Sequence, residues 1–321
     1  MKRYGELYQQ ICSLENIRLA DDKAQKGKAK QYGVILHNKN REINLLTLQE
    51  MLVSKTYKTS AYSTFKVYEP KEREVFRLTY FPDRITHHAV MNVLEPLFVS
   101  VFTADTYSCI KGRGIHGAAN AVKKALRNIP ATQYCLKLDI TKFYPSVDHT
   151  ILKALLRKKI KDNDLLWLLD EIIDSAPGLP IGNYLSQYLA NYYLTFFDHW
   201  LKETMRVKYY FRYADDLVIL ASDKQYLHDL LKQIKTYLES HLKLQVKQNW
   251  QVFPVQKRGI DFVGYRFYHT HVLLRKSIKK NFARMLRKNP DPKSIASYNG
   301  WLKHCNSKRL LYKLLGRYES V

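Results

Sequence analysis

Three aspartates stand at positions where they could hold metal ions. Asp215 and Asp216 are adjacent in the segment Tyr213–Asp216, between the apolar runs Lys208–Tyr213 and Leu217–Ala221. Adjacent carboxylates at a tight turn repel each other, and a divalent cation relieves that repulsion. Magnesium suits such a site because it takes a few carboxylate oxygens and leaves positions for substrate phosphates. By themselves, two aspartates between strands are also ordinary turn formers.

A third carboxylate, Asp139, ends a predicted buried strand over Gln133–Ile140. An aspartate in this position could simply cap the next turn. Together with the hairpin pair it makes a two-metal arrangement, in which one ion lowers the pKa of an attacking hydroxyl and the other stabilises a leaving pyrophosphate. The pattern therefore predicts nucleotidyl transfer, with Asp139, Asp215 and Asp216 as catalytic metal ligands and the Ile140 carbonyl as a further candidate ligand.

The helices and strands predicted around these acids indicate an α+β fold with an antiparallel sheet. Residues 1–65 are expected to be helical, and apolar periodicity predicts further helices over Asp83–Val99, Gly117–Asn128, His149–Lys161, Asn183–Met205 and Tyr226–His241. Strands are predicted within Val67–Thr79, Gln133–Ile140, Lys208–Tyr213, Leu217–Ala221, Leu242–Lys247, Gln251–Val255 and Asp261–Phe267. Asp148, Asp162 and Asp164 are expected to cap helices.

The net charge of the chain indicates which class of partner it binds. The 321 residues include 53 Lys and Arg against 29 Asp and Glu, a net charge of +24, while 46% hydrophobic residues place that charge on a folded surface. Self-repulsion of this size favours a polyanionic partner. No apolar stretch approaches the roughly 18 residues of a membrane span, and no signal peptide is visible. With four cysteines far apart in sequence, we expect a nucleic-acid-binding protein of a reducing cytoplasm and no membrane partner.

The last sixth of the chain carries nearly half of the excess charge. His271–Val321 has thirteen Lys and Arg against two acids, a net charge of +11. Helices are predicted over Ser277–Lys288, Pro292–His304 and Ser307–Arg317. So many cations favour a phosphate-backbone surface. The candidate contacts to a template and primer are Arg275, Lys276, Lys279, Lys280, Arg284 and Arg287.

Six segments in chain order resemble the motifs of reverse transcriptases. Leu136–Tyr144 and Tyr213–Asp216 resemble the two palm motifs that carry the metal-binding acids, the second in the form Tyr-x-Asp-Asp. Lys71–Arg84 resembles the finger region, Cys109–Gly117 the following loop, Gly178–Gln187 the template and nucleotide motif, and Gly259–Phe267 the primer-grip hairpin.

This resemblance implies a right-hand polymerase. Fingers would comprise residues 1–135 with the inserted helices of 146–177, the palm residues 136–145 and 178–268, and a helical basic thumb residues 269–321. The implied reaction is RNA-directed DNA synthesis with two Mg²⁺ ions, or Mn²⁺ in their place. The implied substrates are deoxynucleoside triphosphates, a template RNA and its RNA/DNA primer–template duplex.

The resemblance also implies roles for single residues. Tyr144 matches the steric gate that rejects a ribose 2′-hydroxyl. Lys71 and Arg73 would hold the incoming triphosphate, with Arg77 as the alternative, and Lys247 could protonate pyrophosphate. Gln187 and Ile181 belong to the nucleotide site, and Ile181 and Arg73 are expected to influence fidelity.

Within the family, the segment Ile181–Gln187 is similar to that of diversity-generating retroelement reverse transcriptases, as are Asp83–His88 and Ser297–Trp301. Most relatives place Gln where this chain has Ile181. The subgroup implies a bacterial or phage-encoded enzyme, error-prone copying of template adenines, and a small basic multimeric accessory protein that helps to bind the RNA. Group II intron, retron and antiphage-defence enzymes remain alternatives, as does a catalytically silent RNA-binding scaffold.

A different class of protein is suggested by Gly112–Gly117, which fits the dinucleotide-binding pattern G-x-G-x-x-G, with Asp139 at the expected distance beyond it. That fold needs a buried parallel strand before the first glycine, and Ala104–Lys111 is too polar for one. We therefore expect this match to be fortuitous.

Overall fold

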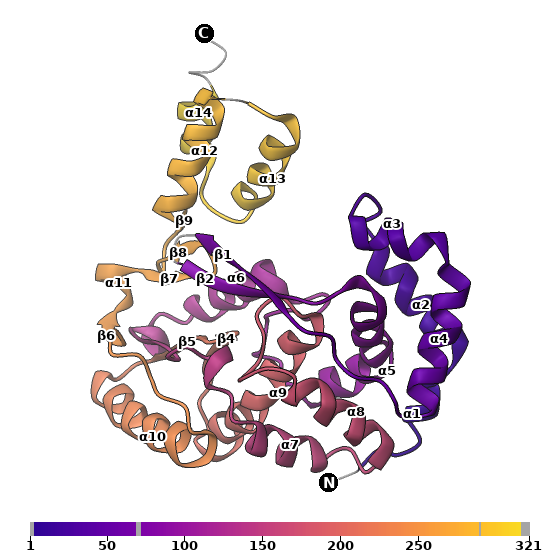
Figure 1. Cartoon of the computed structure of the whole chain (residues 1–321). Helices are drawn as coiled ribbons and strands as arrows, with labels where there is room; N and C mark the ends of the chain where they lie inside the picture. Colours follow the sequence, from indigo (N-terminus) through magenta and orange to yellow (C-terminus); the bar gives the residue numbers. More distant parts are fainter. Residues whose placement is uncertain (1–2, 69–71, 289, 316–321) are drawn as a thin grey trace. The chain divides into compact units, whose positions relative to one another are not determined.

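The computed structural model describes residues 3–68, 72–288 and 290–315. The chain divides into two compact units, each made of separate stretches of sequence. Unit 1 comprises residues 1–102, 142–196 and 239–244, and unit 2 comprises residues 103–141, 197–238 and 245–321. Figure 1 labels most of the helices and strands of both units.

Unit 1 is mainly helical. Its helices are α1 (Tyr8–Cys12), α2 (Leu14–Gln25), α3 (Tyr32–Lys39), α4 (Arg41–Val53), α5 (Ile85–Val101), α7 (His149–Arg157), α8 (Asn163–Asp174) and most of α9 (Tyr184–His199). Helix α2 lies against both α4 and α5. Ile17, Leu48 and Leu94, one from each of these helices, are completely buried. Their burial gives the N-terminal helices a core of their own.

Two of the three predicted helix caps are confirmed. The Asp148 side chain accepts a hydrogen bond from the Ile151 N–H at 3.0 Å and begins α7. The Asp162 side chain accepts one from the Leu165 N–H at 3.1 Å and begins α8. The prediction for Asp164 is wrong, because this residue lies within the first turn of α8.

A two-stranded antiparallel ribbon completes unit 1. It consists of β1 (Ser63–Tyr68) and β2 (Glu72–Arg77), both largely exposed. The strands expected within Val67–Thr79 are confirmed, but β1 begins inside the region predicted to be helical. Helix α4 ends at Val53, and the following polar residues do not continue its apolar face.

The sheet of unit 2 is antiparallel, as predicted. Its strands are β3 (Tyr134–Asp139), β4 (Tyr209–Tyr213), β5 (Asp216–Ala221) and β6 (Gln251–Pro254), in the order β4-β5-β3-β6. Both neighbours of β3 run antiparallel to it. A dinucleotide-binding fold requires parallel strands here, so the interpretation of Gly112–Gly117 as a cofactor motif is excluded.

Helices α6 (Gly114–Leu126) and α10 (Lys224–Leu242) follow the predicted apolar periodicity. Ala118 and Val122 of α6 share a buried cluster with Phe211 and Val218 of the sheet. No helix among the described residues is both long and apolar enough to cross a bilayer.

The strand predicted over Leu242–Lys247 is wrong. Helix α10 runs to Leu242, and Lys243 then adopts a left-handed φ of +51°. Leu244 and Val246 are buried and alternate with exposed residues, which imitates the pattern of a strand. The segment contributes only an isolated bridge between Ile140 and Val246.

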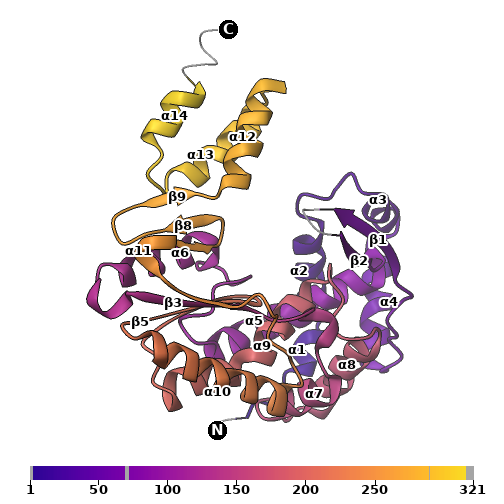
Figure 2. The same cartoon turned by 90° about the vertical axis from the view of Figure 1, so that its left-hand side faces the viewer.

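A second, three-stranded sheet of unit 2 leads into the basic tail. Strands β7 (Ile260–Phe262), β8 (Tyr265–Phe267) and β9 (Val272–Leu274) follow the short helix α11 (Val255–Arg258), and α12 (Lys276–Lys288), α13 (Pro292–Leu302) and α14 (Lys308–Leu315) follow them. Figure 2 shows α12–α14 standing together beside β8 and β9. The three tail helices are confirmed, whereas β9 was not expected.

The tail packs onto the β7–β8 hairpin through Trp301. Gly264 in the turn has a φ of +86°, and a Cβ atom there would stand 2.3 Å from the Trp301 ring. The Tyr265 hydroxyl donates a hydrogen bond to the Trp301 carbonyl at 3.0 Å. Only glycine therefore lets the indole lie against this turn.

Candidate active site

The three predicted catalytic aspartates lie together at one edge of the unit 2 sheet. Asp139 is the last residue of β3 and pairs in register with Asp216, the first residue of β5. Asp215 belongs to the two-residue connection from β4 to β5. Its carbonyl accepts a hydrogen bond from the N–H of the buried Ile140 at 3.3 Å. Strand pairing thus joins acids that are far apart in sequence.

Burial opposes ionisation of the hairpin acids. Removal from water, reinforced by the neighbouring Asp139 charge, raises the pKa of Asp215 to about 7. Burial also raises the pKa of Asp216 to about 6, although Lys137 acts in the opposite direction. Oδ1 of Asp216 is buried and has no hydrogen-bond partner among the described residues. A buried polar oxygen left in this way is costly, and a bound cation would satisfy it.

Two lysines stand beside the acids. Nζ of Lys137 lies 3.5 Å from Oδ2 of Asp216, and Nζ of Lys247 lies 3.4 Å from Oδ2 of Asp139. The Lys247 N–H also donates to the Asp139 carbonyl at 2.8 Å, which holds the two backbones together. Both side-chain separations exceed those of tight hydrogen bonds, so these contacts are mainly electrostatic.

The donor set of the acid cluster fits magnesium. Carboxylate oxygens are hard ligands, and Mg²⁺ is commonly held by one or two of them while water and substrate phosphate complete its shell. In the parts of the chain that the structure describes, no group of three or more His, Cys, Asp or Glu side chains is placed to hold a metal ion by itself. An open site that substrate completes is the arrangement expected for nucleotide chemistry.

A cavity of about 260 Å³ adjoins the acids. Asp139 and Asp216 line it together with Lys137, Arg258 and Arg266. The acid cluster is therefore reachable by a ligand, and the cations around it favour a ligand that carries phosphate.

Tyr144, the predicted steric gate, lies in unit 1. Its half-buried ring meets Phe143 edge-on, with 5.6 Å between the ring centroids. Its carbonyl accepts a hydrogen bond from the Leu179 N–H at 2.8 Å. Gly178 has a φ of +61°, and a Cβ atom there would stand 2.6 Å from the Tyr144 carbonyl oxygen. The Tyr144 turn and the predicted nucleotide motif are therefore in direct contact.

The nucleotide motif is also joined to the β1–β2 ribbon. The Ile181 carbonyl accepts a hydrogen bond from the Phe76 N–H at 2.8 Å. A side chain at Gly182, whose φ is +119°, would meet the Phe76 carbonyl at 2.5 Å. Ile181 and Gln187 are both half-buried. The structure thus brings Tyr144, Ile181 and the ribbon together within unit 1.

The candidate triphosphate ligands differ in their surroundings. Arg73 is exposed on β2, where it pairs in register with Val67 of β1. Lys71 lies outside the described residues. Arg77, the alternative, lines a cavity of about 500 Å³ in unit 1 together with Arg84.

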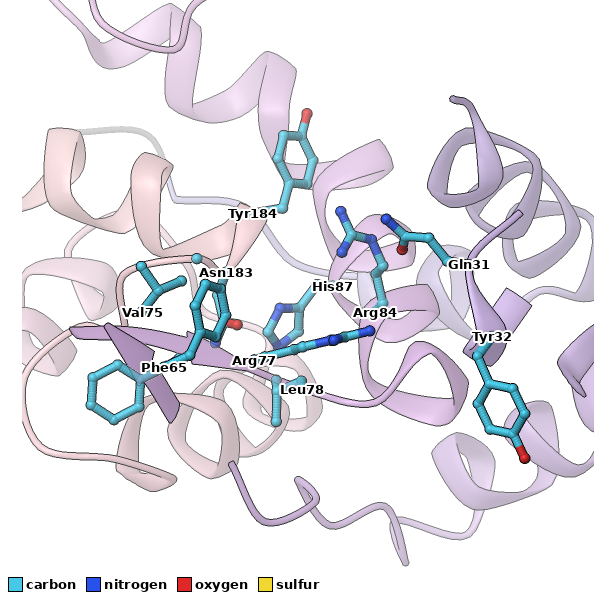
Figure 3. A pocket seen from close by; sticks show the side chains of 12 residues that line it. Gln31, Tyr32, Phe65, Val75, Arg77, Leu78, Arg84, His87, Asn183 and Tyr184 are labelled. Atoms are coloured by element: carbon cyan, nitrogen blue, oxygen red, sulfur yellow. The ribbon is translucent and has the colours of Figure 1, made fainter. Parts of the chain in front are cut away.

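Figure 3 shows the side chains of Arg77, Arg84 and His87 next to one another in this cavity. Burial lowers the pKa of Arg84, and its Nε atom is buried with no hydrogen-bond partner among the described residues. Burial lowers the pKa of His87 to about 4, so this imidazole is neutral near pH 7. Two guanidinium groups at this cavity favour an anionic ligand.

Five of the six predicted template–primer cations share one helix. Lys276, Lys279, Lys280, Arg284 and Arg287 are exposed along α12, whereas Phe282 and Leu286 of the same helix are buried. Arg275 differs, because its Nε and Nη2 atoms both lie 2.6 Å from Oδ1 of Asp261. An ion pair within the protein therefore already engages Arg275.

Comparison with solved structures confirms the α+β right-hand polymerase class of fold. The chain matches telomerase from Candida albicans with a TM-score of 0.53 and 11% identity, over 76% of this chain and 55% of that chain. It matches telomerase from Candida tropicalis with a TM-score of 0.53 over 71% of this chain and 53% of that chain. At such identities the likeness concerns the fold alone.

Within that class, residues 69–267 match the family described as reverse transcriptase (RNA-dependent DNA polymerase). The match covers more than half of the chain, and the protein belongs to this family. The enzyme class expected from the sequence, RNA-directed DNA polymerase, is thereby confirmed.

Relatives of known name are bacterial and intron-type proteins. Protein YkfC of Escherichia coli is 24% identical, over 78% of this chain and 77% of its own length. The group II intron-encoded protein LtrA of Lactococcus lactis is 21% identical, over 58% of this chain and 43% of its own. Nuclear intron maturase 4 of Arabidopsis thaliana is 26% identical, over 52% of this chain and 22% of its own. The chain thus spans less than half of the two intron proteins.

Sequence reasoning missed three charged residues around the acid cluster. Lys137, Arg212 and Asp198 each stand in an otherwise apolar stretch, and the latter two are completely buried. Charged side chains are rarely buried without a partner. An arginine within Tyr209–Tyr213 was therefore the available signal that the hairpin has an internal support.

Proposed function

We propose that this enzyme copies a structured RNA template into complementary DNA by two-metal nucleotidyl transfer. The observation that carries the proposal is the pairing of Asp139 with Asp216 at the strand ends next to Asp215, together with the buried Asp216 Oδ1, which has no hydrogen-bond partner among the described residues. In the reaction, the primer 3′-hydroxyl loses its proton to water, its oxygen bonds to the α-phosphorus of a deoxynucleoside triphosphate, and the bond to the pyrophosphate oxygen breaks. Bound Mg²⁺, or Mn²⁺ on the same ligands, supplies the Lewis acidity for this exchange.

The lysines balance charge at the acid cluster. Lys137 and Lys247 lie near enough to Asp216 and Asp139 to offset the carboxylate charges. With a divalent ion held by the acids, the Lys247 ammonium would be able to turn to the triphosphate, while the Lys137 ammonium also donates to the Asp261 carbonyl. Lys247 would then hold or donate a proton to the departing pyrophosphate.

Substrate selection is assigned to unit 1. Tyr144 would place its ring against the ribose and reject a 2′-hydroxyl, while Arg73 and Lys71 would bind the triphosphate. Ile181 and Gln187 would border the nascent base pair. The hydrogen bonds from Leu179 to Tyr144 and from Phe76 to Ile181 support this assignment, because they connect the Tyr144 turn, the nucleotide motif and the β1–β2 ribbon within unit 1.

The exposed cations of α12 are assigned to the template–primer duplex. In this arrangement residues 1–135 and 146–177 form the fingers, residues 136–145 and 178–268 the palm, and residues 269–321 the thumb. Each phosphate contact that a Lys or Arg makes releases counterions, so duplex binding should weaken steeply with salt.

Primer extension tests the proposed reaction. Purified protein with an RNA template, a DNA primer, deoxynucleotides and Mg²⁺ should lengthen the primer, and Asp215→Asn should abolish extension while the protein stays folded by circular dichroism. Extension by Asp215→Asn equal to wild type would refute the metal site and leave the silent scaffold as the better explanation.

Diversity generation is the biological role that we propose for the polymerase. Ile181 supports it, because an aliphatic side chain cannot hold the template and nucleotide by the polar contacts available to Gln, and looser pairing geometry follows. Misincorporation at template adenines would introduce the diversity. A small basic multimeric accessory protein would assist RNA binding in the cytoplasm of a bacterium or a phage-infected cell.

The substitution Ile181→Gln tests this role. It should lower misincorporation opposite template adenines, measured by sequencing the cDNA of wild type and variant, with errors at the other template bases as the internal control. An unchanged error spectrum would remove the support for adenine-directed mutagenesis without affecting the polymerase assignment.

An intron-type role is the second candidate. It is favoured by the similarity to LtrA and to nuclear intron maturases, whose names place them with introns. Under this alternative, wild-type cDNA should carry no excess of errors opposite adenine. The protein should also bind an intron-derived RNA more tightly than the structured template RNA of a diversity-generating retroelement. The same sequencing experiment therefore separates the two roles.

A further inference from the structure

The hairpin that carries Asp215 has a buried ion pair beneath it. Arg212 of β4 and Asp198 at the end of α9 are both completely buried. Nε of Arg212 lies 2.8 Å from Oδ1 of Asp198, and Nη2 lies 2.5 Å from Oδ2. This two-pronged geometry fixes the plane of the guanidinium group relative to the carboxylate.

Neighbouring hydroxyl groups complete the ion pair. The Tyr210 hydroxyl donates to Oδ1 of Asp198 at 2.7 Å, and the Thr106 hydroxyl donates to Oδ2 at 3.0 Å. The Arg212 backbone is fixed as well, because its N–H donates to the Asp105 carbonyl at 2.9 Å and its carbonyl accepts from the Tyr107 N–H at 3.0 Å. Arg212 is thus immobilised through both its side chain and its main chain.

The third guanidinium nitrogen of Arg212, Nη1, contacts the turn between β4 and β5. Nη1 donates a hydrogen bond to the carbonyl of Ala214 at 3.1 Å. Ala214 immediately precedes Asp215 and has a φ of +53°, a left-handed conformation that glycine adopts readily and alanine does not. A non-glycine residue persists in such a conformation when the surrounding structure determines it. The bond to Arg212 is a contact of this kind.

We propose that Arg212 is a positioning residue, which holds the Ala214 peptide so that the following Asp215 carboxylate is presented to the catalytic metal. Asp198 anchors the guanidinium group from the opposite side. This inference rests on the proposed function, since it takes Asp215 to be a metal ligand. It assigns Arg212 no contact with substrate or metal.

The substitution Arg212→Lys separates this role from simple stability. A lysine ammonium can still pair with Asp198 but lacks the rigid fork needed to bond the carboxylate and the Ala214 carbonyl together. We expect Mn²⁺ to bind the variant about tenfold more weakly or worse, as for the loss of outer partners at other metal sites. Electron paramagnetic resonance of free Mn²⁺ measures this on the full-length protein without any turnover.

A rescue and a control sharpen the measurement. In the double variant Arg212→Lys with Ala214→Gly, glycine adopts the left-handed turn without support, and we expect at least half of the lost Mn²⁺ affinity, on a logarithmic scale, to return. The control Tyr210→Phe removes one hydrogen bond from Asp198 and leaves the Arg212–Ala214 bond in place. It should lower the melting temperature while keeping the Mn²⁺ dissociation constant within about twofold of wild type.

Each outcome of these measurements either supports or refutes the positioning role of Arg212. It is overturned if Arg212→Lys lowers the melting temperature without weakening Mn²⁺ binding, or if glycine at position 214 restores nothing. Should Arg212→Lys not fold, Asp198→Asn takes its place with the same expected direction, because it keeps the side-chain shape and removes the charge that anchors the guanidinium.

Failure of the proposed function would be recognised separately. Asp215→Asn in the same titration should remove the Mn²⁺ site altogether. If Asp215→Asn binds Mn²⁺ like the wild type, the metal site itself is misplaced. If only Asp215→Asn weakens binding, the metal site stands and the role of Arg212 is lost.

Discussion

Two β-hairpins of this protein carry candidate site residues, and they are built in opposite ways. The β4–β5 hairpin of unit 2 buries almost every residue between its ends and presents Asp215 and Asp216. The β1–β2 ribbon of unit 1 is exposed along most of its length and presents Arg73 and Arg77. The first is held by a sheet and a buried ion pair, and the second by its own ladder and by contacts that include the hydrogen bond from Phe76 to Ile181.

The contrast between the two hairpins reflects what each kind of ligand requires. Metal ions need carboxylate oxygens held in place before they bind, so the acids are attached to a packed hairpin. A two-stranded ribbon is only marginally stable in water on its own, yet its exposed cations can adjust to a phosphate whose arrival supplies the missing contacts. The following predictions test this contrast.

The largest effect is expected from breaking the support of the buried hairpin. Asp198→Ala leaves the Arg212 guanidinium buried without its partner, which costs about 3–5 kcal/mol of the free energy of unfolding. Urea unfolding followed by circular dichroism measures the loss. A change below about 1 kcal/mol would mean that the Arg212–Asp198 pair does not hold this hairpin.

The second-largest effect is expected from removing an acid from the metal cluster. Asp139→Asn should reduce primer extension by about two to three orders of magnitude, because preorganised charge at the reacting centre is lost. The matched control Glu74→Gln changes an exposed acid of the β1–β2 ribbon. Comparable losses of primer extension in the two variants would contradict the assignment of metal binding to the acid cluster and not to the β1–β2 ribbon.

The ribbon cations should show a smaller effect confined to ligand binding. Arg77→Ala removes a guanidinium group from the cavity in Figure 3, and charge-assisted bonds are worth about 1.5–3 kcal/mol, or roughly tenfold or more in the dissociation constant. Fluorescence anisotropy with a labelled deoxynucleoside triphosphate measures binding, and Arg73→Ala provides the comparison. A defect in Arg73→Ala alone would assign the anion to Arg73 instead.

The smallest effect is expected for the exposed ion pair of the ribbon. Lys66 and Glu72 form a salt bridge with both side chains about half exposed or more. Lys66→Ala should therefore change the free energy of unfolding by less than about 1 kcal/mol. A loss as large as that of Asp198→Ala would show that the ribbon is as firmly built as the buried hairpin.

Local patterns predicted the elements that bury one clear face. Helix α10 has leucines at helical spacing, and β3 ends an apolar run on Asp139, so both were found close to their observed bounds. The error at Leu242–Lys247 arose because buried residues alternate there without a strand partner along the segment. Strand β9 has three residues, too few for periodicity to show.

The family, the acidic motifs and the excess of positive charge could be predicted from the amino-acid sequence alone, because these depend on residue types and short spacings. Only the tertiary structure decided that Arg275 is engaged by Asp261, that Arg77 lines a cavity with Arg84, and that a buried arginine reaches the Ala214 carbonyl. Such contacts join residues through strand pairing and packing. Their formation depends on where each chain segment comes to lie, and no local pattern encodes that position.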